Sequence, residues 1–299
     1  MTQDRSDEEG RRVAVVTGAS AGIGKATAAR LAGLGWHVIA VGRDRQRCAT
    51  AHEEIRAAAA PGAKVEFVRG DFTLMADVRR VAAEIAARTG RLDCLINNAG
   101  GVRDALYRTA EGNEATFAAN HLAPFLLTRE LMPLLKAGAA RLPPGSVRVI
   151  AVSSSGHRMS RGMDWGDLQS FGNFVPAAAY CQAKLANLLF TRALARRAAA
   201  DGILAQAMHP GVVASNFASH GDAAMQAHMA ASSAVSPDEP AQTLVWLATA
   251  PEAGRDPGRY FHRMAEEIPA ETALDDEAAE RLWIESEALL DGSLRAPPR

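Results

Sequence analysis

The chain reads as an α/β protein built on one doubly wound parallel sheet of about seven strands, with helices on both faces. Three observations predict this fold. Short runs of β-branched residues alternate with longer Ala-, Leu- and Arg-rich segments of helical period, the pattern of βαβ units. A glycine-rich turn joins the first such run to the first helical segment. The 299 residues, 48% hydrophobic and 22% charged, suffice for one large globular domain with a substantial core.

Each predicted strand is a short, mostly apolar run. In chain order these runs are VAVVT at 13–17, HVIAV at 37–41, KVEFVR at 64–69, LDCLI at 92–96, SVRVIAVS at 146–153, ILAQAM at 203–208 and GRYF at 258–261. The turn Pro143-Pro144-Gly145 precedes the fifth strand and marks its start.

Each predicted helix is a longer segment of helical period between two strands or after the last one. The helices are expected at 23–34, 45–59, 74–89, 111–137, 178–200, 240–249 and 276–290. Because connections between parallel strands are right-handed, these helices divide between the two faces of the sheet. We expect one domain over residues 13–291, a flexible segment at 1–12 and a tail at 292–299.

Composition and charge limit the partners, the kinds of site and the cellular location that are expected. The net charge is −1 with a pI near 6.7 and no basic block, so neither nucleic acid nor an anionic membrane surface is an expected partner. Three scattered cysteines (Cys48, Cys94 and Cys181) argue against a disulfide framework or a zinc site and favour a reducing compartment. The sequence has a polar N-terminal segment and no apolar run long enough to span a bilayer. A cytoplasmic location is therefore expected.

Tyr180 and Lys184 are four residues apart in a predicted helix, so their side chains share one helix face. A phenol ordinarily loses its proton near pH 10. A cation about 4 Å away contributes roughly 4 kcal/mol at an effective dielectric near 20, and one pKa unit is about 1.4 kcal/mol. Lys184 could therefore lower the pKa of Tyr180 enough for acid–base chemistry on an oxygen. An ordinary helix pair explains the spacing equally well at this point.

The glycine-rich turn has the pattern of a dinucleotide-binding turn. Its glycines permit a tight bend and close approach to a pyrophosphate, and the following helix N-terminus offers free N–H groups. The residues expected to bind the cofactor here are Thr17, Gly18, Ser20, Ala21, Gly22, Ile23 and Gly24.

Residues after the next strands are expected to reach the rest of the dinucleotide. Arg43 directly follows the second strand and suits a 2′-phosphate, so NADP is favoured over NAD, although Asp44 keeps NAD open. Asp71, followed by Phe72, could accept a hydrogen bond from the adenine amine or cap the next helix. After the fourth strand, small residues would let a ribose approach; the expected contacts there are Asn98, Ala99 and Gly100.

Together these blocks resemble the short-chain dehydrogenase/reductase superfamily, which has a Rossmann-type fold, and within it the branch similar to retinol dehydrogenases and WW-domain oxidoreductases. The resemblance runs from about residue 13 to about residue 290. The blocks that carry it are TGASAGIG at 17–24, NNAG at 97–100, NHLAPFLLT at 120–128, VSS at 152–154, YCQAKLAN at 180–187, HPGVV at 209–213, AQT at 241–243, GRYF at 258–261 and RLW at 281–283.

The resemblance implies roles for particular residues. Tyr180 would be the general acid/base, and Lys184 would lower its pKa while binding the nicotinamide ribose. Ser154 would hydrogen-bond the substrate oxygen, although its neighbours Ser153 and Ser155 leave this assignment open by one position. Asn120 would anchor a water chain that leads protons to Lys184. The nicotinamide pocket would be lined by Pro210, Gly211 and Val213.

The expected function is hydride transfer between NADP(H) and a carbonyl/alcohol pair. Loops 155–179 and 213–237 would select the substrate, and Phe217, Met225 and Met229 in the second loop hint at a lipophilic one. Two alternatives remain: an epimerase or dehydratase with the same fold, and a non-catalytic NADP(H)-binding regulator. No metal is expected, because His121 and His157 lack partners at ligand spacing. By the resemblance, a homodimer or homotetramer would pair through the helices at 111–137 and 178–200.

Overall fold

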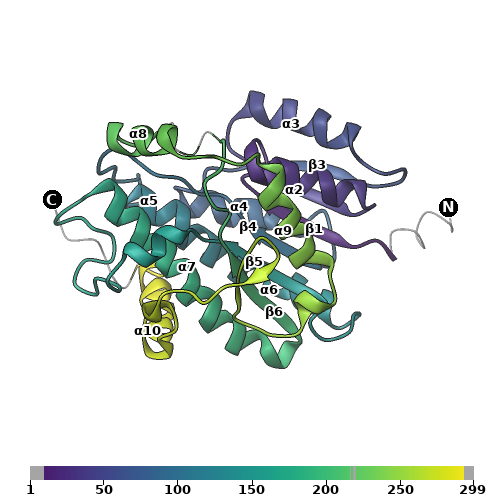
Figure 1. Ribbon diagram of the computed structural model, residues 1–299. Helices are drawn as coiled ribbons and strands as arrows, with labels where there is room; N and C mark the ends of the chain where they lie inside the picture. The colour runs from purple at the N-terminus through teal and green to yellow at the C-terminus, as the bar shows by residue number, and fades with distance from the viewer. Residues whose placement is uncertain (1–9, 216, 218–219, 293–299) are drawn as a thin grey trace.

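The computed structural model describes residues 10–215, 217 and 220–292 of the chain (Figure 1). Residues 1–9 of the expected flexible segment and residues 293–299 of the expected tail lie outside the described residues. The described part forms one eight-stranded sheet in the order β3-β2-β1-β4-β5-β6-β7-β8. The strands are β1 (Val13–Thr17), β2 (His37–Gly42), β3 (Val65–Arg69), β4 (Cys94–Asn97), β5 (Val147–Val152), β6 (Ile203–Met208), β7 (Tyr260–His262) and β8 (Ala265–Glu266).

The predicted parallel sheet is confirmed, with one addition. Strands β1 to β7 pair in parallel, and the two-residue β8 pairs antiparallel with β7. The sequence prediction missed β8, which is too short to show an apolar period. Strands β1, β2, β4, β5 and β6 are buried at every position, as expected for a sheet covered on both faces.

Helices cover the two faces of the sheet (Figure 1). On one face lie α2 (Gly22–Gly33), α3 (Arg45–Ala57) and α9 (Asp238–Thr249), which share a core with the strands. On the other face lie α4 (Met75–Ala86), α6 (Ala123–Ala139), α7 (Pro176–Ala198) and α10 (Asp276–Leu290), which form a second core. Short 3₁₀ turns complete the described chain at η2 (Ser155–Met159), η3 (Ala199–Asp201), η5 (Glu252–Gly254) and η6 (Glu271–Ala273).

The helix predicted at 111–137 begins later than expected and is not a uniform α-helix. Gly112 has φ +88°, and Glu114 caps the helix start by accepting hydrogen bonds from the N–H groups of Thr116 and Phe117, each at 2.7 Å. The chain then forms α5 (Ala115–Phe117), a π-helical turn η1 (Ala118–Leu122) and only then α6. Single π-turns inside helices are frequent at functional sites. This one contains Asn120.

The sequence prediction also missed one helix. Within loop 213–237 the chain forms α8 (Ala223–Ala231), whose first turn is capped by Asp222 through the Met225 N–H at 2.8 Å. In Figure 1, α8 lies at the top of the molecule. Because α8 follows β6, it stands on the side of the sheet where the parallel strands end.

Helix α10 packs against α6 and α7, the two helices expected to pair with another subunit. Trp283 of α10 lies 4.7 Å from the Phe125 ring and 5.9 Å from the Phe190 ring, centroid to centroid. His121 Nε2 lies 2.8 Å from the hydroxyl of the buried Ser286. The α10 helix of the same chain therefore covers part of the expected pairing surface. None of the helices in the described ranges combines the length and apolar character needed to cross a bilayer.

Candidate active site

The glycine-rich turn between β1 and α2 has the backbone geometry of a phosphate-binding turn. Gly18 and Gly22 have φ values of +67° and +54°. A Cβ atom on Gly24 would lie 2.4 Å from the carbonyl oxygen of Gly18, so only glycine fits there. No side chain caps the first turn of α2. The N–H groups at the start of α2 are thus available for an anion.

Thr17 and Asn98 fasten the ends of β1 and β4 together. The Thr17 hydroxyl accepts hydrogen bonds from the N–H groups of Asn98 and Ala99, both at 2.9 Å, and the Asn98 amide donates to the Thr17 carbonyl at 2.8 Å. A Cβ on Gly18 would meet the Asn98 side chain at 2.8 Å. The side chains of these two residues therefore shape the floor of the turn.

Arg43 and Asp44, which follow β2, have different contacts. Asp44 caps α3 by accepting from the Arg47 N–H at 2.8 Å, and this hydrogen bond lowers its pKa. Arg43 is exposed, with its guanidinium 4.0 Å from the Asp71 carboxylate. Arg69 at the end of β3 lies near enough to add to the electrostatic lowering of the Asp44 pKa. The sequence prediction missed Arg69, although its place as the last residue of a neighbouring parallel strand put it at the same edge.

Asp71 and Phe72 adopt a turn before α4. The Asp71 carboxylate accepts from the Thr73 N–H at 2.9 Å and from the Thr73 hydroxyl at 2.8 Å. The helix cap expected from Asp71 comes instead from Glu111, which accepts from two N–H groups in the first turn of α4. The Phe72 side chain is buried in the core, so only its backbone could meet a cofactor.

The structure brings Tyr180, Lys184 and Ser154 together beyond the end of β5. The Lys184 ammonium donates to the Val152 carbonyl at 3.0 Å and lies 5.5 Å from the centre of the Tyr180 ring. Both side chains are buried. A side-chain hydrogen bond joins Ser154 to Tyr180.

The three adjacent serines have different environments. Ser153 is buried, and its hydroxyl donates to the Lys184 carbonyl at 2.8 Å. Ser154 is half-buried; its hydroxyl accepts from the Gly156 N–H at 3.1 Å and faces Tyr180. Ser155 is exposed. The geometry therefore favours Ser154 as the serine that meets a substrate oxygen.

Burial is the largest cause of the pKa shifts of Tyr180 and Lys184. It raises the pKa of Tyr180 above the ordinary phenol value, and the hydrogen bond with Ser154 opposes that rise. Burial also lowers the pKa of Lys184 to about 8. The expected lowering of the Tyr180 pKa by Lys184 is thus corrected: the buried phenol has a raised pKa, and desolvation is the largest cause. Tyr180 is a protonated phenol at neutral pH, the form that can donate a proton.

Asn120 reaches the site from the π-turn. Its amide donates to the carbonyls of Gly101 and Thr116, both at 2.8 Å, and its oxygen accepts from the Gly101 N–H at 3.2 Å. A Cβ on Gly100 would lie 2.4 Å from the Asn120 oxygen and 3.3 Å from the Lys184 ammonium. The helix distortion thus places Asn120 beside the Asn-Asn-Ala-Gly turn and Lys184.

The segment after β6 lies over this group. Gly211 has φ +75°, and Val213 is buried and paired with Val235. The Phe217 ring packs on the Tyr180 ring at 5.0 Å between centroids. A Cβ on Gly22 would lie 3.6 Å from Ser215, so the same segment reaches the phosphate turn. It therefore covers the space between the phosphate turn and Tyr180.

Aromatic rings of loop 155–179, which was expected to select the substrate, hold the loop in place. Trp165 stacks under the Arg281 guanidinium at 4.4 Å and packs on the core, and Phe171 lies under Arg108 at 4.0 Å. Gln182 of α7 holds the loop through the Asp164 N–H at 2.9 Å. The loop is thus a packed part of the fold.

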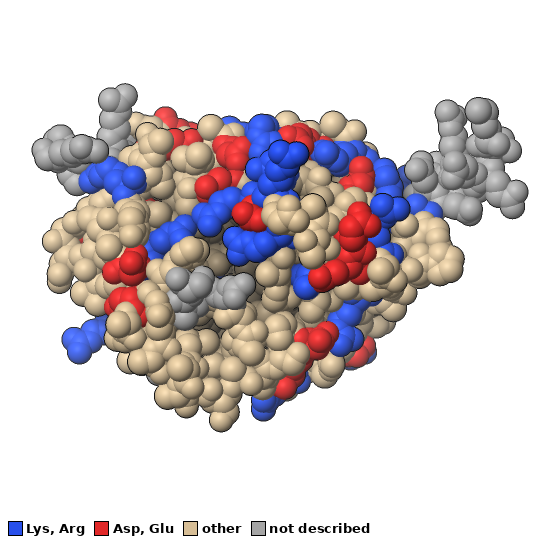
Figure 2. All heavy atoms as spheres, turned by 90° about the horizontal axis from the view of Figure 1, so that it is seen from above, with Lys and Arg blue, Asp and Glu red and all other residues tan. Residues whose placement is uncertain are grey.

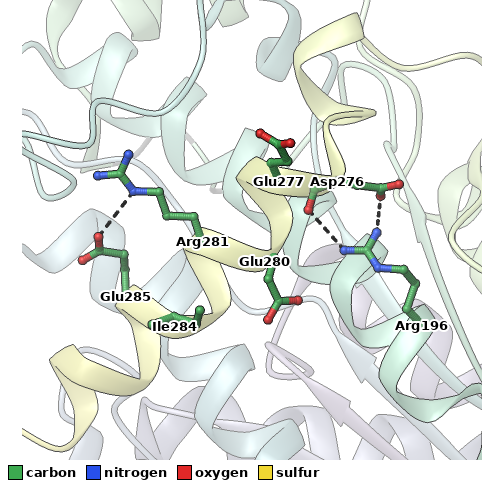
Figure 3. Close-up of a pocket in the computed structure, with 7 residues that line it drawn as sticks. All are labelled: Arg196, Asp276, Glu277, Glu280, Arg281, Ile284 and Glu285. Atoms are coloured by element: carbon green, nitrogen blue, oxygen red, sulfur yellow. Dashed lines mark hydrogen bonds and ion pairs between the residues drawn. The ribbon is translucent and has the colours of Figure 1, made fainter.

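Figure 2, which views the molecule from the side of α8, shows a hollow bordered on one side by Lys and Arg side chains. Two other hollows lie elsewhere and contain none of the predicted site residues. One, of about 540 Å³, is lined by α7 and α10; Arg196 of α7 pairs across it with Asp276 of α10, and Arg281 pairs with Glu285 along α10 (Figure 3). The other, of about 660 Å³, lies between α2 and α9. Within the described ranges no three metal-ligating side chains gather.

Comparison with known proteins places the chain in a family. The family model described as short chain dehydrogenase matches residues 12–226. Human "Retinol dehydrogenase 13" is 36% identical over 296 residues, covering 96% of this chain and 86% of that protein. Mouse "Polyprenol dehydrogenase" is 38% identical over 279 residues, covering 92% and 82%.

Solved structures of the same fold include cofactor complexes. The "Pseudomonas aeruginosa RhlG/NADP active-site complex" has a TM-score of 0.67 and 26% identity, covering 88% of this chain and 96% of that one. A 3-ketoacyl-(acyl-carrier-protein) reductase from Brucella melitensis, complexed with NADH, has a TM-score of 0.64 and 25% identity, covering 84% and 95%. The glycine turn, the buried Tyr180–Lys184 pair and these relatives agree: the chain belongs to the short-chain dehydrogenase family of oxidoreductases.

Proposed function

We propose that this protein interconverts a carbonyl and an alcohol with NADP(H), using Tyr180 as the general acid and base. The observation that carries the proposal is the buried group of Tyr180, Ser154 and Lys184 beside an uncapped, glycine-lined helix start. A pure cofactor-binding protein has no need for a buried phenol hydrogen-bonded to a serine. The residues present therefore fit a dinucleotide and a reaction at an oxygen.

The cofactor would be held by the α2 N-terminus, by Lys184 at the nicotinamide ribose and by the Gly211 turn at the nicotinamide. When bound, it would supply or accept the hydride. For carbonyl reduction, Ser154 and Tyr180 hydrogen-bond the substrate oxygen, and the Tyr180 phenol gives its proton to that oxygen as negative charge develops there. Asn120, held at Gly101 and Thr116, lies beside Lys184 and would help return a proton to the site.

The NADP preference is supported at the end of β2. Asp44, which could have bound a ribose hydroxyl, is engaged as the cap of α3. Arg43 is exposed, and Arg47 and Arg69 lie close enough to influence Asp44 electrostatically. Three guanidinium groups around one strand edge suit a 2′-phosphate better than a bare ribose.

A lipophilic substrate is supported by the cover of the site. Phe217 packs on Tyr180, and a Cβ on Gly221 would lie 3.0 Å from Val102 and 3.1 Å from Met225. Phe217 thus places an apolar ring on Tyr180, and Met225, beside Gly221, is an adaptable apolar side chain. Two relatives are named for lipophilic alcohols, retinol and polyprenol. We therefore propose long-chain or isoprenoid aldehydes, ketones and alcohols as the substrate class.

The test is NADPH oxidation with a panel of aldehydes and ketones of increasing chain length. Loss of general acid catalysis lowers rates about 10²- to 10⁴-fold, so Tyr180→Phe should lower kcat by at least about 10²-fold. Tyr107→Phe is the matched control, because Tyr107 is exposed and its hydroxyl hydrogen-bonds only Asp104 among the contacts of the described chain. Unchanged turnover in Tyr180→Phe would remove Tyr180 from the mechanism.

A further inference from the structure

Two turns flank the Tyr180 phenol, and one C-terminal segment touches both. The first turn follows β5 and carries Ser154; the second follows β6 and carries Gly211. After β8 the chain continues through residues 267–270, which we call the brace segment, before η6. The brace segment contacts one histidine from each turn, His157 and His209.

His157 is buried and is held in one tautomer by its partners. Its Nε2 lies 3.0 Å from the backbone N–H of Ala270 and must accept that hydrogen bond. The proton of the neutral ring therefore lies on Nδ1, which donates to the Ser154 carbonyl at 2.6 Å. Burial lowers the pKa of His157, in agreement with a neutral ring. His157 thus links the brace segment to the serine that faces Tyr180.

His209 has the opposite tautomer. Its Nδ1 accepts from the Gly211 N–H at 3.3 Å, so the proton lies on Nε2, which donates to Glu267 at 2.9 Å. The second carboxylate oxygen of Glu267 accepts from Arg158 at 2.6 Å, and Arg158 also donates to the Ile268 carbonyl at 2.5 Å. Glu267 therefore joins the Gly211 turn to the residue that follows His157.

A buried ring separates the two histidines. Tyr260 of β7 lies 5.3 Å from the His157 ring and 5.4 Å from the His209 ring, centroid to centroid. His262 stacks on the other side of His209 at 4.1 Å, and its Nδ1 donates to the His209 carbonyl at 3.1 Å. The spacing between the turns is therefore set by packed rings as well as by hydrogen bonds.

We propose that Glu267, His157 and His209 are positioning residues that fix the Ser154 turn relative to the Gly211 turn. The inference rests on the proposed function, in which Ser154 holds the substrate oxygen and the Gly211 turn faces the nicotinamide. Hydride transfer depends on the distance between these two sites, and a misplacement of about 1 Å can cost about 10²-fold in rate. Hydrogen bonds to histidines in fixed tautomers are directional, so this network constrains the spacing of the two turns more closely than apolar packing alone would.

The kinetic test compares Glu267→Ala with Glu266→Ala. Glu266 is the adjacent carboxylate on β8; it is exposed and pairs with Arg259. We expect Glu267→Ala to lower kcat about 10-fold or more, with KM for NADPH changed less than about threefold, because the turns stay folded but lose their spacing. Glu266→Ala should keep wild-type kcat. Equal kcat values in the two variants would overturn the proposal.

The histidine is tested by rescue. His157→Phe fills the ring space but cannot make either hydrogen bond, whereas His157→Gln offers both a donor and an acceptor. We expect His157→Phe to lower kcat about 10-fold or more and His157→Gln to recover at least half of the wild-type kcat, in proportion to the restored alignment. Full activity in His157→Phe, or equal loss in both variants, would contradict the positioning role.

A spectroscopic readout on the wild-type protein does not depend on turnover. Long-range ¹H–¹⁵N correlation spectra of the ¹⁵N-histidine-labelled wild-type protein should show one neutral Nδ1–H ring and one neutral Nε2–H ring for His157 and His209, assigned with His157→Gln and His209→Gln. A different tautomer at His157 would overturn the network. If no carbonyl substrate is turned over, the proposed function fails alone, and the network is then judged by these spectra.

Discussion

At the scale of single residues, the burial of the Lys184 ammonium lowers the stability of the folded protein. It is buried beside Tyr180 with one hydrogen bond to the Val152 carbonyl, and its pKa falls from 10.5 to about 8. The unfolded chain therefore binds more protons than the folded protein between about pH 8 and pH 10.5. By linkage, stability rises with pH across that window and carries the full penalty below about pH 8.

We therefore expect Lys184→Met to raise the free energy of unfolding of the cofactor-free protein at pH 7 by up to about 3 kcal/mol, while turnover is lost. The gain should shrink from pH 8 upward and vanish near pH 10.5. Denaturant titrations across pH 7 to 10.5 measure it. Lys136→Met is the control, because Lys136 is exposed and pairs with Asp201 at 3.0 Å. A constant difference between wild type and Lys184→Met would exclude this cause.

The sequence predicted which candidate residues lie together better than it predicted their electrostatics. The motif spacing placed Tyr180 and Lys184 on one helix face, and the structure brings them together near Ser154. It did not show that burial raises the Tyr180 pKa, because desolvation depends on what the fold packs around a group. The contacts of Glu267 were equally hidden, since its partners Arg158 and His209 lie 109 and 58 residues away along the chain.

At the scale of elements, a hydrogen bond links the π-turn η1, which carries Asn120 of the candidate site, to the C-terminal helix α10. His121, in the same turn as Asn120, donates from Nε2 to Ser286, whose hydroxyl donates to the Leu282 carbonyl at 2.7 Å. The other ring nitrogen of His121 has no partner among the described residues. Burial lowers the pKa of His121 from 6.5 to about 3. The ring is therefore neutral while α10 is docked.

This burial makes α10 docking sensitive to acid. The unfolded chain binds a proton at His121 below about pH 6.5 and the folded protein only near pH 3, so the stability present above pH 6.5 falls by up to about 5 kcal/mol toward pH 3. We expect His121→Phe, which fits among Phe117, Phe125 and Phe190, to flatten the pH dependence of unfolding between pH 6.5 and 4. The same substitution at the exposed His220 should leave the wild-type slope, and a wild-type slope in His121→Phe would refute the assignment.

Some strands and helices could be predicted from the sequence pattern alone, and others could not. Strands β1 and β6 have the predicted bounds, because uniform apolar runs between turn residues have few other structures open to them. The helix predicted at 111–137 begins four residues late, at Ala115, because the Gly112 turn and the Glu114 cap set its start, and the sequence did not show its π-turn. Helix α8 was missed although its Asp222 cap stood in the sequence. Local signals thus fix an element's existence more securely than its irregularities.

At the scale of the whole molecule, the proposed dinucleotide site spans both halves of the sheet. The phosphate turn follows β1, the Arg43 edge follows β2, and the Tyr180 group and Gly211 turn follow β5 and β6. The segment after β6 touches the phosphate turn at Ser215 and Tyr180 at Phe217. A ligand bound across these elements contacts folded chain from all of them and cannot be bound by the unfolded chain. Its affinity should therefore appear directly in global stability.

Thermal unfolding with each cofactor tests the NADP preference through this linkage. At a free concentration 100 times Kd, a ligand adds about 2.7 kcal/mol to the free energy of unfolding. We expect NADPH to raise the wild-type Tm more than equal NADH does. Arg43→Ala should remove a charged hydrogen bond worth about 1.5–3 kcal/mol, weakening NADPH about 10- to 100-fold and leaving NADH unaffected. Arg56→Ala, at the far end of α3, should keep the wild-type preference. Equal shifts from both cofactors in the wild type would contradict the preference, because the exposed Arg43 edge would then contribute nothing to binding.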